Sequence, residues 1–189
     1  MQTYFVDILY ENQIFQQDYF NLKEFEACTF FDCNFSGVSI IGVAFADCTF
    51  VGCTFDHAKI NHVAFRTAVF RDCSIREVNF AMVDKFIFEV AFDSCTLDFS
   101  KFYALKLKSA QFSNSSLVAV DFMATDLSLV IFDNCDLYRA EFKQANCAKT
   151  DFKTSRNYSI DPTKTNIKKA VFSKTEVKGL LFKHDVVVV

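Results

Sequence analysis

The chain has 189 residues, a formal net charge of −3 and a sequence pI of about 5.6, and 51% of its residues are hydrophobic. This apolar content does not indicate a membrane protein, because no run approaches the roughly 18–20 apolar residues of a spanning helix. We also expect no secretion signal, since the start lacks a basic region and contains Asp7 and Glu11. Only four Gly and one Pro indicate a single domain without a flexible linker.

The first 22 residues carry only a weak pattern of aromatic side chains, at Tyr10, Phe15 and Phe20. An open β-structure exposes unpaired backbone groups at each end and must be covered there. We therefore predict an irregular N-terminal cap over residues 1–22.

From residue 23 to residue 154 a large side chain recurs at every fifth position. A helix repeats its apolar face at about 3.6 residues and a strand at about 2, so neither keeps these side chains on one face. A chain that turns a corner every five residues does so, because four segments close one square coil of 20 residues. Of 25 central positions 16 are Phe: Phe25, Phe30, Phe35, Ile40, Phe45, Phe50, Phe55, Ile60, Phe65, Phe70, Ile75, Phe80, Phe92, Leu97, Phe102, Leu107, Phe112, Leu117, Phe122, Leu127, Phe132, Leu137, Phe142, Cys147 and Phe152.

The residue two places before each centre is small or β-branched, except at Lys23 and Leu105. A large central side chain leaves little room for an inward neighbour in a narrow coil, where voids and overpacking are both unfavourable. Segments such as CTFFD, CNFSG, CTFVG and CDLYR resemble the units of the pentapeptide-repeat family over residues 23–154. This resemblance implies an all-β solenoid, a right-handed quadrilateral β-helix of about seven coils, with a short C-terminal helix and strand.

One phase slip, at residues 81–87, places two extra residues between Phe80 and the next expected inward residue, Ile87. A structural bulge and a functional loop both account for it. After the slip, residues 20 apart should stack in the core. The expected columns are Phe102, Phe122 and Phe142 in one, and Phe112, Phe132 and Phe152 in another.

Two groups of apolar residues are candidates for interfaces. Positions that the repeat assigns to solvent within one coil carry Val118, Met123, Leu129 and Ile131. Exposed apolar clusters often mark binding surfaces, although scattered ones are normal. Residues 155–189 are predicted to form a C-terminal cap and dimerisation module, similar to that of Qnr and MfpA-type members of the family. Its candidate dimer contacts are Val177, Leu180, Leu181, Phe182, Val186, Val187, Val188 and Val189. A tail that folds back over the last coil is the alternative.

No catalytic, metal or cofactor site is predicted. The sequence has no Gly-rich phosphate loop and no HExxH or paired CxxC motif. His57 and His62 should point outward from adjacent faces. The eight cysteines occupy inward positions, where a free thiol packs as a small hydrophobic group. We expect them to remain reduced in a cytoplasmic protein.

The charge distribution bears on partners. Residues 1–57 carry eight acids and one Lys, a net charge of −7, whereas residues 137–189 carry eleven bases and five acids, a net charge of +6. We expect a non-enzymatic rod that binds an unknown protein and does not contact nucleic acid directly. The alternative that the resemblance implies is a Qnr/MfpA-like DNA mimic that binds DNA gyrase or topoisomerase IV and protects it from quinolones.

Overall fold

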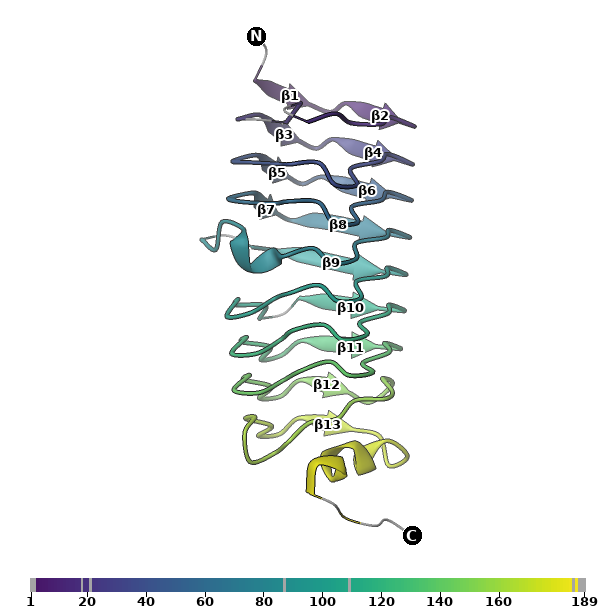
Figure 1. The fold of residues 1–189 in the computed structure, drawn as a ribbon, viewed down its shortest axis with the longest axis vertical. Helices are drawn as coiled ribbons and strands as arrows, with labels where there is room; N and C mark the ends of the chain where they lie inside the picture. The colour runs from purple at the N-terminus through teal and green to yellow at the C-terminus, as the bar shows by residue number, and fades with distance from the viewer. Residues whose placement is uncertain are drawn as a thin grey trace.

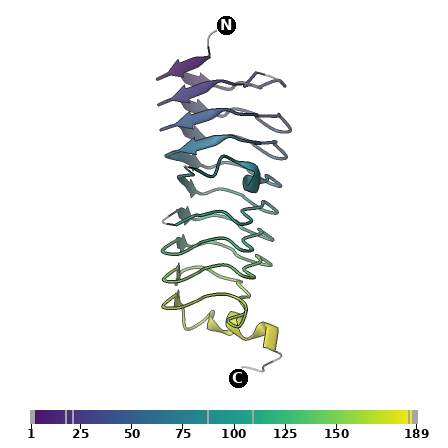
Figure 2. The same cartoon turned by 90° about the vertical axis from the view of Figure 1, so that its left-hand side faces the viewer.

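The computed structural model describes residues 3–17, 19–20, 22–86, 88–108, 110–184 and 186. They form a rod of stacked coils with the chain ends at opposite tips (Figures 1 and 2). All strand pairs are parallel, which confirms the right-handed quadrilateral β-helix. No helix in these residues is both long and apolar enough to traverse a bilayer.

The regular elements are short because the chain turns a corner every five residues. The strands are β1 (Tyr4–Val6), β2 (Leu9–Glu11), β3 (Glu24–Glu26), β4 (Thr29–Phe31), β5 (Ala44–Ala46), β6 (Thr49–Val51), β7 (Ala64–Arg66), β8 (Ala68–Arg71), β9 (Val90–Asp93), β10 (Gln111–Ser113), β11 (Ile131–Asp133), β12 (Asp151–Phe152) and β13 (Val171–Phe172). The 3-10 helices are η1 (Phe80–Met82), η2 (Val177–Leu180) and η3 (Phe182–His184).

The rod has four long faces, numbered here in the order in which the chain follows them. Face 1 is a nine-stranded sheet in the order β13-β12-β11-β10-β9-β8-β6-β4-β2. Faces 2 and 3 are ladders of single bridges, which include Thr96↔Ser116 on face 2 and Lys101↔Asp121 on face 3. Face 4 is the four-stranded sheet β1-β3-β5-β7, continued by bridges such as Lys106↔Asp126.

The central side chains fill the interior as stacked columns. Phe132 is 1% exposed, and its ring lies parallel to those of Phe112 and Phe152 at centroid distances of 5.1 and 5.2 Å. Phe122 stacks in the same way on Phe102 and Phe142, at 5.3 and 5.5 Å. Rings of neighbouring columns meet edge to face, an arrangement that aromatic quadrupoles favour. Coil stacking and ring stacking therefore share one 20-residue register.

The corners are formed by residues in the left-handed region of backbone space. Among the described residues, 24 that are not glycine have positive φ, including Phe99 at 62° and Leu129 at 66°. This conformation brings Cβ close to the following carbonyl oxygen in an L-residue, at a cost of roughly 1–2 kcal/mol. The buried columns on either side of each corner offset that cost.

The coil extends beyond both boundaries that the sequence suggested. Strands β1 and β2 extend the ladders instead of forming an irregular cap, because Phe5 and Tyr10 continue the period of five and pair with Phe25 and Phe30. At the other end, Phe172 stacks on Phe152 at 5.2 Å, so the ladder continues past residue 154. The expected C-terminal helix is the pair of short helices η2 and η3, and most of the expected terminal strand, Val187–Val189, lies outside the described residues.

The phase slip adds two residues without breaking the face 1 sheet. Strands β8 and β9 pair with a separation of 22 residues, as in Phe70↔Phe92, instead of 20. The extra residues follow η1 and form a protruding loop (Figure 1). Phe88 packs against Phe65 and Phe80 at centroid distances of 6.2 and 6.0 Å. Ile87, the residue expected to point inward here, lies outside the described residues.

Candidate protein-interaction surfaces

The four apolar residues of the candidate interface lie on different sides of the rod. Val118 follows a face 2 bridge residue, Met123 follows a face 3 bridge residue, and Ile131 begins β11 on face 1. Leu129 lies at the corner between faces 4 and 1, near Ile131, and these two side chains are 43% and 50% exposed. The structure therefore brings Leu129 and Ile131 together but separates them from Val118 and Met123.

A more continuous apolar surface lies on the N-terminal half of face 1. We call it the apolar strip, and it comprises Leu9, Thr29, Phe31, Thr49, Val51, Val69 and Ala91. These side chains come from the adjacent strands β2, β4, β6, β8 and β9. Leu9 is 58% and Phe31 41% exposed, and the other five are half-buried.

The residues of the strip occupy outward positions, which the five-residue period of inward side chains does not constrain. Each residue precedes or follows a central residue, so its side chain points to the opposite side of the strand. Residues 20 apart at such positions, as in Thr29 and Thr49, become neighbours once the coils stack. Comparing outward positions 20 apart would have found this surface in the sequence.

Carboxylates border the strip on both long sides. Asp32 and Asp72 lie at the corner between faces 1 and 2, and Asp47 and Glu89 at the corner between faces 4 and 1. All four are exposed. Arg71 is the one basic residue at the outward positions of the five strands that form the strip. The strip is therefore an apolar surface with a predominantly acidic border.

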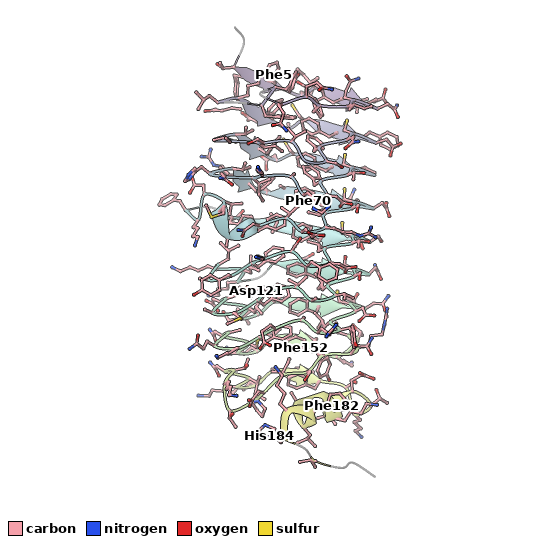
Figure 3. All side chains as sticks on the ribbon, in the orientation of Figure 1. Phe5, Phe70, Asp121, Phe152, Phe182 and His184 are labelled. Atoms are coloured by element: carbon pink, nitrogen blue, oxygen red, sulfur yellow. The ribbon has the colours of Figure 1, made fainter. Side chains whose placement is uncertain are left out.

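The C-terminal helices pack partly against the last coil. Gly179 is buried, its carbonyl accepts a hydrogen bond from the Ile160 N–H at 3.0 Å, and Leu180 packs against the core. Val177, Leu181 and Phe182 are exposed by 44%, 37% and 58%. The tail thus both covers the coil and presents apolar side chains to solvent, near the lower tip of the rod where Phe182 and His184 are seen in Figure 3.

Ion pairs attach η3 to the side of the rod. Lys183 Nζ lies 3.3 Å from Glu141 Oε2, and His184 Nε2 lies 3.4 Å from Asp161 Oδ1. The Asp161 carboxylate also accepts hydrogen bonds from the backbone N–H and hydroxyl of Thr163, at 2.9 and 2.6 Å. A groove of about 400 Å³ lies beside these contacts, with Glu141, Asp161 and Lys183 among its lining residues.

The hydrogen bonds from Thr163, together with Lys164, lower the pKa of Asp161 to about 2. An unfolded Asp has a pKa of about 3.9, so the carboxylate binds its proton less readily in the folded chain. The resulting stabilisation is fully present above about pH 4 and is lost as the pH falls towards 2.

The thiols lie in the interior and are unpaired. All eight cysteines are free and buried. The Cys53 Sγ, for example, donates to the Phe30 carbonyl at 3.3 Å. Burial raises the pKa of the Cys48, Cys135 and Cys147 thiols to about 12. Within the described part of the chain, no three His, Cys, Asp or Glu side chains are grouped as metal ligands.

We expect the thiols to be unreactive in the folded protein, because all eight are buried. For Cys48, Cys135 and Cys147 the raised pKa also depletes the thiolate, which is the nucleophile. Iodoacetamide at pH 8 should modify none of the eight cysteines readily before denaturation. Mass spectrometry after denaturation without reductant should then find all eight modified. Fewer than eight would reveal a disulfide and contradict the assignment of free thiols.

Comparison with known proteins identifies the repeat. The family described as "Pentapeptide repeat region" matches residues 23–84, and "Pentapeptide repeats (8 copies)" matches residues 106–144 and 121–156. Together these matches span more than half of the chain. No curated protein sequence matches it.

Solved structures that are similar to the rod include two with a TM-score above 0.5. One is trypsin-treated QnrB1, a plasmid-mediated fluoroquinolone resistance protein, with 15% identity, a TM-score of 0.51, and coverage of 98% of this chain and 100% of that one. The other is HetL, a pentapeptide repeat protein involved in heterocyst differentiation regulation from the cyanobacterium Nostoc sp. strain PCC 7120. It has 12% identity, a TM-score of 0.58, and coverage of 94% and 88% of the two chains. At these identities the similarity concerns the fold alone.

Proposed function

The chain belongs to the pentapeptide-repeat family, and from this we propose that it is a non-enzymatic, cytoplasmic rod that binds another protein through its outer faces. The interior supports an external role, because central side chains such as Phe70 and Phe132 fill the coil and are 1% exposed. The observation that carries the proposal is the apolar strip on face 1, since an extended apolar patch with a polar border is typical of protein interfaces.

Affinity capture with a paired variant tests this function. The intact rod and a Val51→Lys variant, which places a charge at the centre of the strip, are each cross-linked in cell extract. A partner identified by mass spectrometry is then purified, and its affinity for the intact rod is measured by calorimetry. We expect stoichiometric, saturable binding of one protein. Failure of the intact rod to retain any protein that binds saturably would contradict a protein-binding function.

We also propose a homodimer formed by the C-terminal module. Val177, Leu181 and Phe182 lie within six residues of sequence and are exposed at the tip of the rod. A two-fold arrangement would bury the same apolar patch on both copies. Lys174 and Lys178 of the two copies would lie at the shared tip, so the paired ends repel each other electrostatically.

This repulsion gives the dimer a characteristic salt dependence. We expect light scattering to show a dimer whose dissociation constant falls as NaCl is raised from about 50 to 500 mM, because salt screens like charges. Phe182→Asp should give a monomer at micromolar concentration. Phe86→Asp is the matched control, because Phe86 is 90% exposed on the loop after η1. A monomeric intact chain would contradict the proposal, and a dimer retained by Phe182→Asp would place the interface elsewhere.

A Qnr-like role as a DNA mimic is the second candidate. Carboxylates follow the edge between faces 1 and 2, namely Glu11, Asp32, Asp72, Asp93 and Asp133. Gly52 and Asn114 occupy corner positions of the same edge and leave it less charged than a DNA duplex, which carries one negative charge per roughly 1.7 Å. The acidic edge nevertheless has the sign of charge needed to occupy the surface with which a partner protein binds duplex DNA.

A supercoiling assay decides between the two candidates. DNA gyrase is assayed with the rod present, with and without a quinolone, and the assay is repeated with topoisomerase IV. Inhibition of supercoiling or protection from the drug by the intact rod, weakened by Asp32→Asn with Asp72→Asn, would support the DNA mimic. Absence of both effects would exclude it and leave the general protein-binding function in place.

A further inference from the structure

We propose that the apolar strip on face 1 binds an amphipathic α-helix of a partner protein, with an apolar stripe flanked by Lys and Arg residues. This inference rests on the proposed protein-binding function and specifies its ligand. Four observations carry it: the pairing of the strands, the spacing of the coils, the acidic border and a small pocket at one side of the strip.

The pairing of the strands excludes the addition of a strand over the strip. β4, β6 and β8 are each paired with a neighbour on both sides, so their ladder-forming N–H and C=O groups are already used. An added strand requires a free sheet edge. A ligand on this part of face 1 therefore contacts side chains, and a helix can present an apolar row of them without needing backbone partners.

The spacing of the coils suits a helix that lies along the rod. Neighbouring strands are about 4.8 Å apart, and the turns of a helix are about 5.4 Å apart, so each turn faces nearly one coil. The five strands of the strip span on the order of 19 Å, the length of about 13 helical residues. Leu9 and Val69 lie towards the two ends of this span, with Phe31 and Val51 between them.

The acidic border selects the charge of the helix. Asp32 and Asp72 lie on one side of the strip and Asp47 and Glu89 on the other. Apolar residues along the middle of the helix would pack on Phe31 and Val51. Basic residues at both edges of its apolar stripe would then lie beside carboxylates, which favours association and disfavours acidic helices.

A pocket of about 190 Å³ offers an anchor at the phase slip. It lies beside β8, β9 and the start of β10, and its lining includes Val69, Glu89, Ala91 and Gln111. Thr67 Oγ1 donates to Glu89 Oε2 at 3.4 Å, so this carboxylate retains further acceptor capacity. A Lys side chain would pack its methylene groups on Val69 and Ala91 and pair its ammonium group with Glu89.

Selection from a library of 16-residue helices provides the test. Peptides displayed on phage, with a fixed helical scaffold and one randomised face, are selected on the intact rod. Peptides that also bind a Val51→Lys rod are removed. We expect the remaining peptides to carry an apolar stripe with Lys or Arg at both edges. Enrichment of acidic or uncharged flanks, or no binder specific for the intact rod, would overturn the inference.

Variants of the rod then locate the bound peptide. One selected peptide is synthesised and its affinity is measured by fluorescence anisotropy. Val51→Lys should weaken binding at least tenfold and Glu89→Gln about three- to tenfold, whereas Val118→Lys on face 2 should leave it within twofold. Glu89→Gln preserves side-chain shape, so it separates loss of charge from misfolding. Equal affinity for Val51→Lys and the intact rod would contradict the strip as the binding surface.

The two proposals fail in distinguishable ways. If the intact rod and Val51→Lys capture the same partner equally from extract, the protein-binding function stands and the strip is the wrong surface. If selected peptides bind the strip but no cellular protein is retained, the surface is able to bind helices and the proposed function fails. Equal melting temperatures of the intact rod and its three variants, Val51→Lys, Glu89→Gln and Val118→Lys, establish that each protein is folded.

Discussion

Replacing Phe132 with Ala is expected to lower the free energy of unfolding by about 3–5 kcal/mol. The Phe132 ring lies between Phe112 and Phe152 and meets Phe122 edge to face at 5.7 Å. The substitution leaves a cavity within a column of rings that are fixed by the coil spacing on both sides. Because the backbone ladder holds β10, β11 and β12 in place, the column cannot collapse to fill it.

Urea denaturation followed by circular dichroism measures this loss. Phe86→Ala is the matched control, because the Phe86 side chain is 90% exposed and its removal leaves no cavity. We expect the control to change the free energy of unfolding by less than about 0.5 kcal/mol. A loss below about 1 kcal/mol for Phe132→Ala would contradict the close packing of the column.

Gly179→Ala is expected to displace the C-terminal helices from the last coil. A Cβ atom at this position would clash with the Tyr158 carbonyl oxygen and would lie 2.8 Å from the Tyr158 Cδ2 atom. Neither contact is tolerable, and the first involves backbone that is fixed by the coil. Overpacking of this kind costs about 1–3 kcal/mol, so η2 should move away and expose Leu180.

Hydrogen exchange at Ile160 reports this displacement directly. Its N–H donates to the Gly179 carbonyl at 3.0 Å in the intact chain, and Gly179→Ala should abolish its protection. The Phe102 N–H, which donates to Asp121 in the middle of the rod, should stay protected. Lys178→Ala is the control at the preceding, exposed position. Full protection of Ile160 in Gly179→Ala would mean that the last coil accommodates the added methyl group.

If the C-terminal module forms the dimer, the same variant should also weaken self-association. Displacement of η2 changes the position of Val177 and alters the patch that two copies would share. Light scattering compares Gly179→Ala with the intact chain under matched salt conditions. A dimer of unchanged affinity, together with loss of Ile160 protection, would separate the dimer interface from η2.

The period of five determined the fold from the sequence alone. It requires no knowledge of distant contacts, because each inward residue packs against residues 20 positions away that obey the same rule. Phe30, Phe50 and Phe70 are neighbours in space because they are equally spaced in sequence. The predicted limits of the repeat, residues 23 and 154, were too narrow, because Phe5 and Phe172 continue the coil on either side of them.

The outer surfaces depended on the tertiary structure. The period constrains a residue only where its side chain packs inward, so outward residues carry no five-residue pattern and must be compared 20 positions apart, in the register that the stacked coils set. Which of them become neighbours depends on the face to which the corners assign them. Val118 and Ile131 are close in sequence but lie on different faces, whereas Phe31 and Val51 are 20 residues apart and adjacent. The inward pattern of this sequence therefore determined the rod, and the stacking of its coils decided which side chains form the apolar strip.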